Sequence, residues 1–241
     1  SQELGAKLTV IWNANAECNA QWGDLFQPVE QIDQLRQHSK LLLRLKSRIC
    51  PLLRCQKPLP LTKIDDLEEW IATHGKSCRL YIQSFSKFYR PHSESIKLFI
   101  PLPHLQQQIN FLTQQEQIGI HIRRTDNKKS ISESPLSLFE TMIQEEINRN
   151  HEARFFLATD DLETERQLQN RFPNRITVQP NKLLDRNNRV AIQNAVVDLF
   201  ALSRCKKVWG SYWSSFSVEA ARIGGIPLTI LKQEQKRGDA E

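Results

Sequence analysis

The sequence predicts an α/β protein with two lobes, of which the second is a parallel β-sheet flanked by helices. The first observation is a series of short apolar segments, beginning near residues 117, 154, 175, 206 and 226, that alternate with longer segments of helical periodicity. Strands that alternate with helices in this way are typical of a parallel, Rossmann-like sheet. The second observation is a change of composition near residue 113, before which strand-like segments are separated by helical patterns and prolines. We therefore expect a smaller α/β lobe over 1–113 and the Rossmann-like lobe over 114–241.

The first lobe begins with residues 1–5, which resemble the last turn of a helix closed by a glycine. This turn runs directly into a strand-like segment at 7–12, and a second strand is expected at 78–82. A Rossmann-like lobe that begins inside a helix lacks its first strand and the loop after it. We therefore expect this sequence to be truncated at its N-terminus.

The second lobe begins with a strand at 117–123, where isoleucines alternate with other residues at the period of a pleated strand. Apolar residues at helical spacing then predict a helix over 136–147. A short apolar strand follows at 154–158. Asp160, with Glu163 three residues later, has the pattern of a helix start, and this helix ends near Phe172. The remaining elements are strands at 175–178, 206–210 and 226–231 and helices at 191–200 and 214–223.

The composition indicates an ordinary globular protein. The 241 residues are 39% hydrophobic and 25% charged. No apolar run approaches the ~18 residues of a membrane-spanning helix, and no leader opens the sequence, so a cytoplasmic protein is expected unless a leader lies outside this sequence. The five cysteines are scattered, which predicts free thiols and no metal site. The formal charge of +6 comes from dispersed residues without a basic stripe interleaved with aromatic residues, so nucleic-acid binding is not expected.

The end of the 117–123 strand is the first candidate site, because ligands of a doubly wound sheet bind outside the carboxyl ends of its strands. His121 and Arg123 share one face by alternation, and Arg124 lies at or beyond the end of the strand. Two guanidinium groups are therefore expected at the mouth of the crevice, followed by Asp126. Arginine suits phosphate because its planar donors bind two oxygens and it stays charged. The alternative is an arginine pair bridged to surface carboxylates, with His121 a satisfied core histidine.

The segment 210–217 is the second candidate site, because Ser211, Ser214 and Ser215 lie between a strand and the start of a helix. Small hydroxyl residues at a helix start leave backbone N–H groups pointing outward, where the helix dipole favours negative charge. A diphosphate would fit there. The alternative is that the serines simply cap the helix.

Two acidic positions complete the set of candidates. Thr159 and Asp160 follow the 154–158 strand and could face a nucleotide, although Asp160 with Glu163 is also explained as a capping box. Asp198 is a lone acid within an apolar helix. Acids are rarely buried unless paired, so its partner is either an N–H donor of a purine or a nearby arginine.

Several sequence motifs of other enzyme classes are missing. The sequence has no phosphate loop, no GxGxxG, no nucleophile elbow, no HExxH and no Asp-x-Asp pair that would bridge a metal to a sugar nucleotide. Negative charge on a leaving diphosphate would then be stabilised by arginines and a helix terminus.

Three strings together resemble the fucosyltransferase superfamily, which contains the α1,6-fucosyltransferases, the nodulation fucosyltransferases and the protein O-fucosyltransferases. They are GIHIRRTD at 119–126, LATDD at 157–161, and DLFALS at 198–203 with the serine-rich segment after it. The match spans 117–225. The resemblance implies a two-lobed, GT-B-like glycosyltransferase that is metal-independent and inverting and has no cofactor. Its donor would be GDP-fucose or a related GDP-sugar, and its acceptor a hydroxyl of a glycan, lipid or protein.

The resemblance also implies roles for individual residues. The diphosphate would be bound by Arg123, with Arg124 beside the sugar–phosphate bond, while guanine would lie near His121 and Asp198 and phosphate would be held by Ser214 and Ser215. The family's Gly-x-Gly-Asn loop near the N-terminus is missing, and the glutamate that the α1,6 enzymes carry beyond the arginines matches Glu133 only after a shift. The catalytic base is therefore unassigned. The alternative to an enzyme is a catalytically silent module that binds a GDP-sugar or a glycan.

Overall fold

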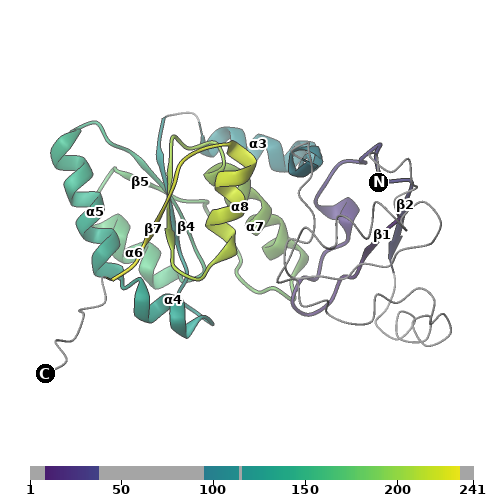
Figure 1. The fold of residues 1–241 in the computed structure, drawn as a ribbon, viewed down its shortest axis with the longest axis horizontal. Coiled ribbons are helices and arrows are strands. Elements are labelled where there is room, and N and C mark those ends of the chain that lie inside the picture. Colours follow the sequence, from purple (N-terminus) through teal and green to yellow (C-terminus); the bar gives the residue numbers. More distant parts are fainter. Residues whose placement is uncertain (1–8, 38–94, 114–115, 234–241) are drawn as a thin grey trace, which may run out of the picture. The chain divides into compact units, whose positions relative to one another are not determined.

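The computed structural model describes residues 9–37, 95–113 and 116–233. The chain divides into two compact units. The first unit comprises Ser1–Glu17 and Gln21–Ile100, and the second comprises Cys18–Ala20 and Pro101–Glu241. Most of the described residues belong to the second unit, which contains every candidate site residue named above (Figure 1).

The described part of the first unit contains two parallel strands, β1 (Thr9–Trp12) and β2 (Gln34–Gln37), and the short 3-10 helices η2 (Trp22–Asp24) and η4 (Ser95–Leu98). The ring of Trp22 packs against three other aromatic rings, with centroids 5.3 to 5.5 Å apart, on Trp12, Phe26 and Phe99. β1 lies within the strand predicted at 7–12, whereas β2 was not predicted. The helix turn expected at 1–5 and the strand expected at 78–82 lie outside the described residues.

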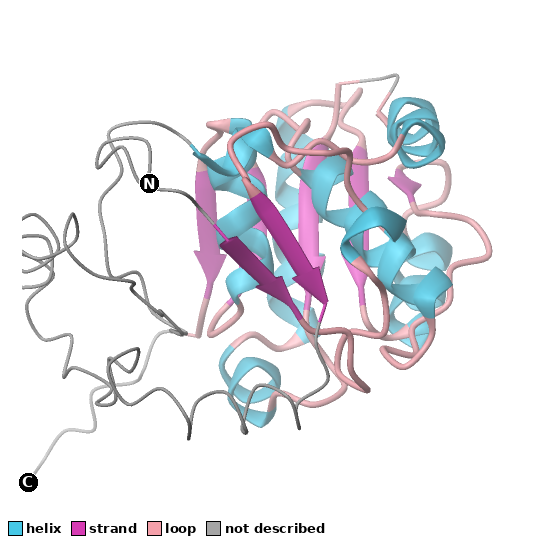
Figure 2. Cartoon of the chain, turned by 90° about the vertical axis from the view of Figure 1, so that its right-hand side faces the viewer, coloured by secondary structure: helices cyan, strands magenta, loops and turns pink. Residues whose placement is uncertain are grey.

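The second unit is built on a parallel sheet of five strands in the order β5-β4-β3-β6-β7. The strands are β3 (Ile118–Ile122), β4 (Phe155–Thr159), β5 (Ile176–Thr177), β6 (Val208–Ser211) and β7 (Leu228–Leu231). All five lie where the sequence predicts them. Figure 2 shows these strands running side by side among the helices.

Helices connect the strands on both sides of this sheet (Figure 1). They are α3 (Pro103–Leu112), α4 (Lys128–Glu133), α5 (Leu136–Arg149), α6 (Leu162–Arg171), α7 (Arg189–Leu202) and α8 (Ser215–Gly224). The last four match predicted helices, but α3 and α4 were not predicted. α3 lies before the boundary expected near residue 113, yet it packs on α7 and belongs to the second unit.

The prediction that Asp160 begins α6 is wrong by one residue. The N-cap is Asp161, whose carboxylate accepts hydrogen bonds from the backbone N–H groups of Glu163 at 3.3 Å and Thr164 at 3.0 Å. These bonds satisfy donors that the first helical turn leaves unpaired. Two consecutive aspartates precede the helix, and a sequence pattern does not show which of them takes the cap conformation. The side chain of Asp160 is thereby left for a different contact.

The core of the second unit lies around the two central strands. Every residue of β3 and β4 is buried, as expected for parallel strands that are covered on both faces. Ile120, Phe155 and Leu157 are fully buried and pack with Phe139 and Ile143 of α5. This packed sheet fixes the directions in which the loops after its strands leave.

Replacing Gly224 by alanine should destabilise the second unit. A Cβ atom at this position would overlap the backbone carbonyl oxygen of Ser203, at the end of α7. Overpacking usually costs about 1–3 kcal/mol, and a backbone atom cannot rotate away as a side chain can. We expect Gly224→Ala to lower the free energy of unfolding by about 3 kcal/mol, measured by urea denaturation.

Gly23→Ala is the matched control, because none of the residues that the structure describes, its chain neighbours aside, has an atom within 4 Å of a Cβ built at Gly23. It should change the free energy of unfolding by less than about 1 kcal/mol. Equal unfolding midpoints for Gly224→Ala and the wild type would show that α7 and α8 separate easily at this contact.

Candidate functional site

The strand order creates a topological switch point between β3 and β6. The chain runs outward from β3 through β4 to β5 on one side, and from β6 to β7 on the other. At such a point the loops after the two central strands leave in opposite directions and open a crevice at the carboxyl edge of the sheet. The segments that follow β3 and β6 are the two that the sequence analysis selected first.

His121 lies in β3, is 5% exposed, and stacks on Phe216 in the first turn of α8 with ring centroids 4.9 Å apart. Burial lowers the pKa of His121 to about 4, against the opposing charge of Asp160, so the imidazole is neutral near pH 7. Among the described residues, no group forms a hydrogen bond with its buried Nδ1 atom. His121 is therefore not a satisfied core histidine, and a neutral ring nitrogen can still bind one partner.

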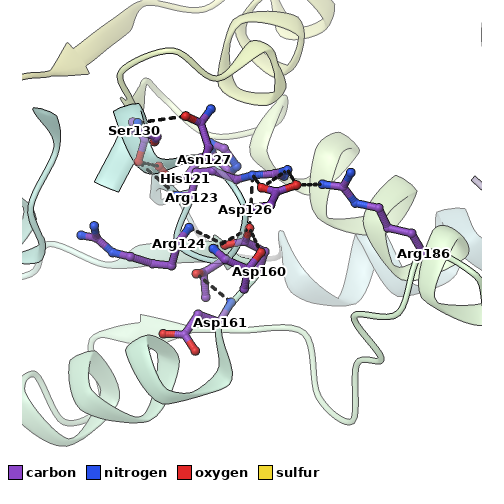
Figure 3. Close-up of polar contacts among 12 residues, drawn as sticks. His121, Arg123, Arg124, Asp126, Asn127, Ser130, Asp160, Asp161 and Arg186 are labelled. Carbon is purple, nitrogen blue, oxygen red and sulfur yellow. Dashed lines mark hydrogen bonds and ion pairs between the residues drawn. The ribbon is translucent and has the colours of Figure 1, made fainter. Parts of the chain in front are cut away.

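The side chain of Arg123 lies between two carboxylates. Its Nε and Nη2 atoms donate to the two oxygens of Asp126 at 2.7 Å each, and Nε lies 3.2 Å from an oxygen of Asp160. Arg186 also donates to Asp126, at 3.0 Å (Figure 3). Burial favours the neutral form of Asp126, but the hydrogen bonds and charge of Arg123, with the charge of Arg186, hold its pKa below the usual range. The bridged arrangement that was the alternative for Arg123 is thus present in the structure.

The guanidinium groups of Arg123 and Arg124 do not lie together. The Nη2 atom of Arg124 donates to the carbonyl oxygen of Ser134 at 3.0 Å, and its side chain points away from Asp126 and Arg186 (Figure 3). The physical reason is that β3 ends at Ile122, so alternation no longer sets the direction of residue 124. Of the two guanidinium groups expected together after β3, that of Arg123 lies against Asp126 and Asp160, and that of Arg124 lies against Ser134.

Asp160 holds the loop after β3. Its carboxylate accepts hydrogen bonds from the backbone N–H of Arg124 at 2.7 Å and from the hydroxyl of Thr125 at 2.7 Å. Thr159, at the end of β4, is buried, and its Oγ1 atom accepts from the backbone N–H of Asp161 at 3.3 Å. Both predicted residues therefore bind the chain itself and hold the loops after β3 and β4.

The serine segment after β6 lies directly against the loop after β3. Buried Ser211 accepts a hydrogen bond from the backbone N–H of Arg123 at 3.1 Å, which joins the two strand ends. Asn127 donates to the carbonyl oxygen of Trp213 at 2.9 Å, and Trp213 has a left-handed backbone with φ of 59°.

Ser214 is the N-cap residue of α8, but its side chain forms no capping hydrogen bond. Ser215, the first helical residue, is exposed. Simple side-chain capping therefore does not account for Ser214, and the first turn of α8 retains backbone N–H donors that an anion can bind.

Asp198 forms a buried charge cluster with Lys182 and Glu165. The ammonium of Lys182, whose side chain is 1% exposed, lies 2.6 Å from Glu165 and 3.8 Å from Asp198. The contact with Glu165 is a close ion pair rather than a well-aligned hydrogen bond. Burial raises the pKa of Asp198 to about 7, although the charge of Lys182 opposes this. The cation beside Asp198 is thus a lysine, whereas the sequence left open an N–H donor of a purine or an arginine.

Sequence reasoning missed three polar residues of this region. Asn127 caps α4 by accepting a hydrogen bond from the backbone N–H of Ser130 at 3.0 Å, a pattern that an Asn before a short polar helix could have revealed. Lys182 and Arg186 lie in the loop between β5 and α7. A loop has no periodicity that would show where its side chains point.

Buried His121 and Asp198 should give opposite dependences of stability on pH. Between about pH 4 and 6.5 the unfolded state binds more protons at His121, so this residue makes stability rise with pH. Between about pH 4 and 7 the folded state binds more protons at Asp198, so that residue makes stability fall as pH rises. We expect His121→Phe to lose stability relative to the wild type as pH rises from about 4 to 6.5, and Asp198→Asn to gain it.

The difference in unfolding free energy between each variant and the wild type should change by up to about 1.4 kcal/mol per pH unit, the value for one proton. Urea denaturation at half-unit steps of pH measures it, and subtracting the wild-type curve removes the contribution of other groups. Parallel curves for both variants would mean that the two side chains titrate as they do in the unfolded chain.

Solved structures of fucosyltransferases have a fold similar to that of this chain. NodZ α-1,6-fucosyltransferase soaked with GDP-fucose is 16% identical, covers 95% of this chain and 86% of its own, and has a TM-score of 0.58. NodZ from Bradyrhizobium is 18% identical over 91% of this chain and 83% of its own, with a TM-score of 0.56. The likeness to NodZ establishes a fucosyltransferase-like, GT-B fold, as the sequence motifs implied. No family model matches the chain, and no curated protein matches its sequence.

Two further properties concern metals and membranes. Over the ranges that the structure describes, no three side chains of His, Cys, Asp or Glu gather closely enough to hold a metal ion. Every helix in those ranges is too short or too polar to cross a membrane.

Proposed function

We propose that this protein is a metal-independent, inverting glycosyltransferase that transfers fucose or a related sugar from a GDP-sugar to a hydroxyl of a glycan, lipid or protein. The observation that supports the proposal best is the grouping at the switch point. An arginine, a neutral histidine and the N-terminus of α8 meet there. Within the described residues, the Nδ1 atom of this histidine has no partner, and the helix has no side-chain cap. These groups suit the base and the diphosphate of a nucleotide.

The nucleotide would lie across the ends of β3 and β6. His121 supports a contact with guanine, because its buried Nδ1 atom has no partner among the described residues and its ring is held by Phe216. Asp198 is proposed as the acid on the base, with Lys182 setting its position and charge. The diphosphate would be bound by Arg123 and by the first turn of α8, where Ser214 and Ser215 add hydroxyl donors.

In the proposed reaction the acceptor oxygen attacks the anomeric carbon on the face opposite the diphosphate. A bond forms between that oxygen and the carbon while the bond from the carbon to the phosphate oxygen breaks, and the acceptor proton passes to a base. Negative charge develops on the departing GDP. Arg123 and the N-terminus of α8 would stabilise this charge because they are fixed in place before the reaction.

Arg124 remains a proposed catalytic residue, acting beside the sugar–phosphate bond. Its guanidinium binds the carbonyl oxygen of Ser134, so this role requires the side chain to exchange that contact for the ligand. Glu133, the shifted match to the family's glutamate, lies at the end of α4 with Lys232 at 3.8 Å. We assign the role of catalytic base neither to Arg124 nor to Glu133.

GDP should stabilise the folded protein and UDP should not. The proposed contacts of His121 and Asp198 suit guanine, which offers N–H donors to an acid, and a ligand at ~100 times its dissociation constant adds about 2.7 kcal/mol. A thermal-shift titration with both nucleotides measures this difference. Addition of EDTA should leave the shift with GDP unchanged, because no metal takes part in the proposed binding.

Equal shifts with both nucleotides, or none with either, would refute the proposal. A strict requirement for Mn²⁺ would refute the mechanism. GDP binding without hydrolysis or transfer of the sugar would instead identify a silent GDP-sugar-binding module.

A further inference from the structure

Arg186 contacts the candidate site although it lies outside every motif. Its guanidinium donates to Oδ2 of Asp126 at 3.0 Å, from the loop between β5 and α7. Arg123 binds the same carboxylate with two hydrogen bonds of 2.7 Å. Figure 3 shows Arg186 reaching Asp126 from a segment separate from the one that contains Arg123. One carboxylate group therefore lies between two guanidinium groups from different loops.

The position of Arg186 is set by the fold of its loop. The backbone N–H of Leu183 donates to the side chain of Asn194 in α7 at 2.9 Å, and that of Asn188 donates to the carbonyl of Asp185 at 2.9 Å. The carbonyl of Arg186 itself accepts from the backbone N–H of Asn19 at 3.0 Å. Bonds at Arg186 and on both sides of it thus hold the backbone from which its side chain reaches Asp126.

We propose that Arg186 is a second phosphate-binding arginine, and that the carboxylate of Asp126 holds the anion position between Arg186 and Arg123 until a diphosphate displaces it. The inference rests on the proposed function and adds a residue to its diphosphate site. A planar carboxylate and a phosphate both bind a guanidinium through two oxygens, so one can replace the other. The position of the Asp126 carboxylate then corresponds to the position of a phosphate group of the ligand.

The exchange of Asp126 for a diphosphate is favourable on electrostatic grounds. The side chains of Asp126 and Arg186 are 50% and 44% exposed, and ion pairs at such exposure contribute little to stability. A diphosphate has more negative charge and more acceptor oxygens than one carboxylate, so it binds both arginines more strongly. Asp160 remains to hold the loop, since its bonds go to the backbone of Arg124 and Thr125.

The test is calorimetric titration of GDP and of guanosine, which lacks phosphate, into three variants and the wild type. Arg186→Gln should lower the affinity for GDP about tenfold or more, the range for a hydrogen bond to a charged group, and leave the affinity for guanosine unchanged. Asp126→Asn keeps Arg186 but removes the competing charge, so it should retain or strengthen GDP binding.

Arg171→Gln is the control for net charge. Arg171 is exposed, lies in the last turn of α6, and pairs with Glu140 at 3.8 Å. Because α6 returns from the carboxyl edge of the sheet, its last turn lies at the opposite edge, and this variant should bind GDP like the wild type.

Two results would overturn the inference while the proposed function stands: wild-type GDP affinity in Arg186→Gln, or a loss in Asp126→Asn as large as that in Arg186→Gln. The second would mean that the ion pair only positions the loop. If the wild type itself does not bind GDP, the proposed function fails, and the inference fails with it.

Discussion

Replacing Arg123 by lysine should lower the rate of sugar transfer by about 10²–10³. Lysine keeps the positive charge but loses the planar pair of donors that binds two oxygens at once, so the change is not conservative at a diphosphate. The guanidinium is preorganised, since the backbone N–H of Arg123 is bound to Ser211 and its Nε atom lies 3.2 Å from Asp160. The rate of transfer, or of donor hydrolysis when no acceptor is supplied, measures the effect.

Arg171→Lys serves as the matched control and should retain wild-type turnover, because Arg171 lies at the far edge of the sheet. The melting temperature of Arg123→Lys should stay close to that of the wild type, since a partly exposed ion pair contributes little to folding. Wild-type turnover in Arg123→Lys would remove the main support for a transferase. Arg124→Lys, measured in the same assay, tests whether the guanidinium of Arg124 leaves the carbonyl of Ser134 during the reaction. A loss of rate comparable to that of Arg123→Lys would mean that it does.

Replacing Lys182 by methionine should destabilise the protein by about 3–5 kcal/mol at pH 8. The change removes the ammonium that lies against both Glu165 and Asp198 and leaves these two carboxyl groups buried. These groups then take up protons more readily, which lowers the cost of burial in acid. The loss should therefore be smaller at pH 5 than at pH 8, and urea denaturation at the two values measures it.

Lys206→Met is the control for this substitution. The ammonium of Lys206 lies 2.5 Å from Glu116, but the two side chains are 55% and 79% exposed. An exposed ion pair contributes about 0–1 kcal/mol, so the same chemical change should have a small effect there. Equal losses in the two variants would show that burial does not distinguish the pairs.

The fold of the second unit could be predicted from the sequence, because the patterns that reveal it are local. Alternation of isoleucine marks β3, and helical spacing of apolar residues marks α5 and α7. α4 was missed because its six residues are mostly polar and form less than two turns, too short for periodicity. β2 was missed because it consists mainly of polar residues.

The sequence by itself determined which residues follow each strand, and with that the edge of the sheet where His121, Arg123 and Ser214 would gather. Arg123 is the first residue after β3, and Ser211 of β6 still binds its backbone N–H, so the alternation extended from the strand was sufficient to place it. Only the tertiary structure decided the rest. Arg124 turned to Ser134, Asp198 was paired with Lys182, and Arg186 reached Asp126 across 60 positions of the chain. These contacts depend on how loops from different strands pack, and loops lack the repeating geometry that lets a pattern predict a direction.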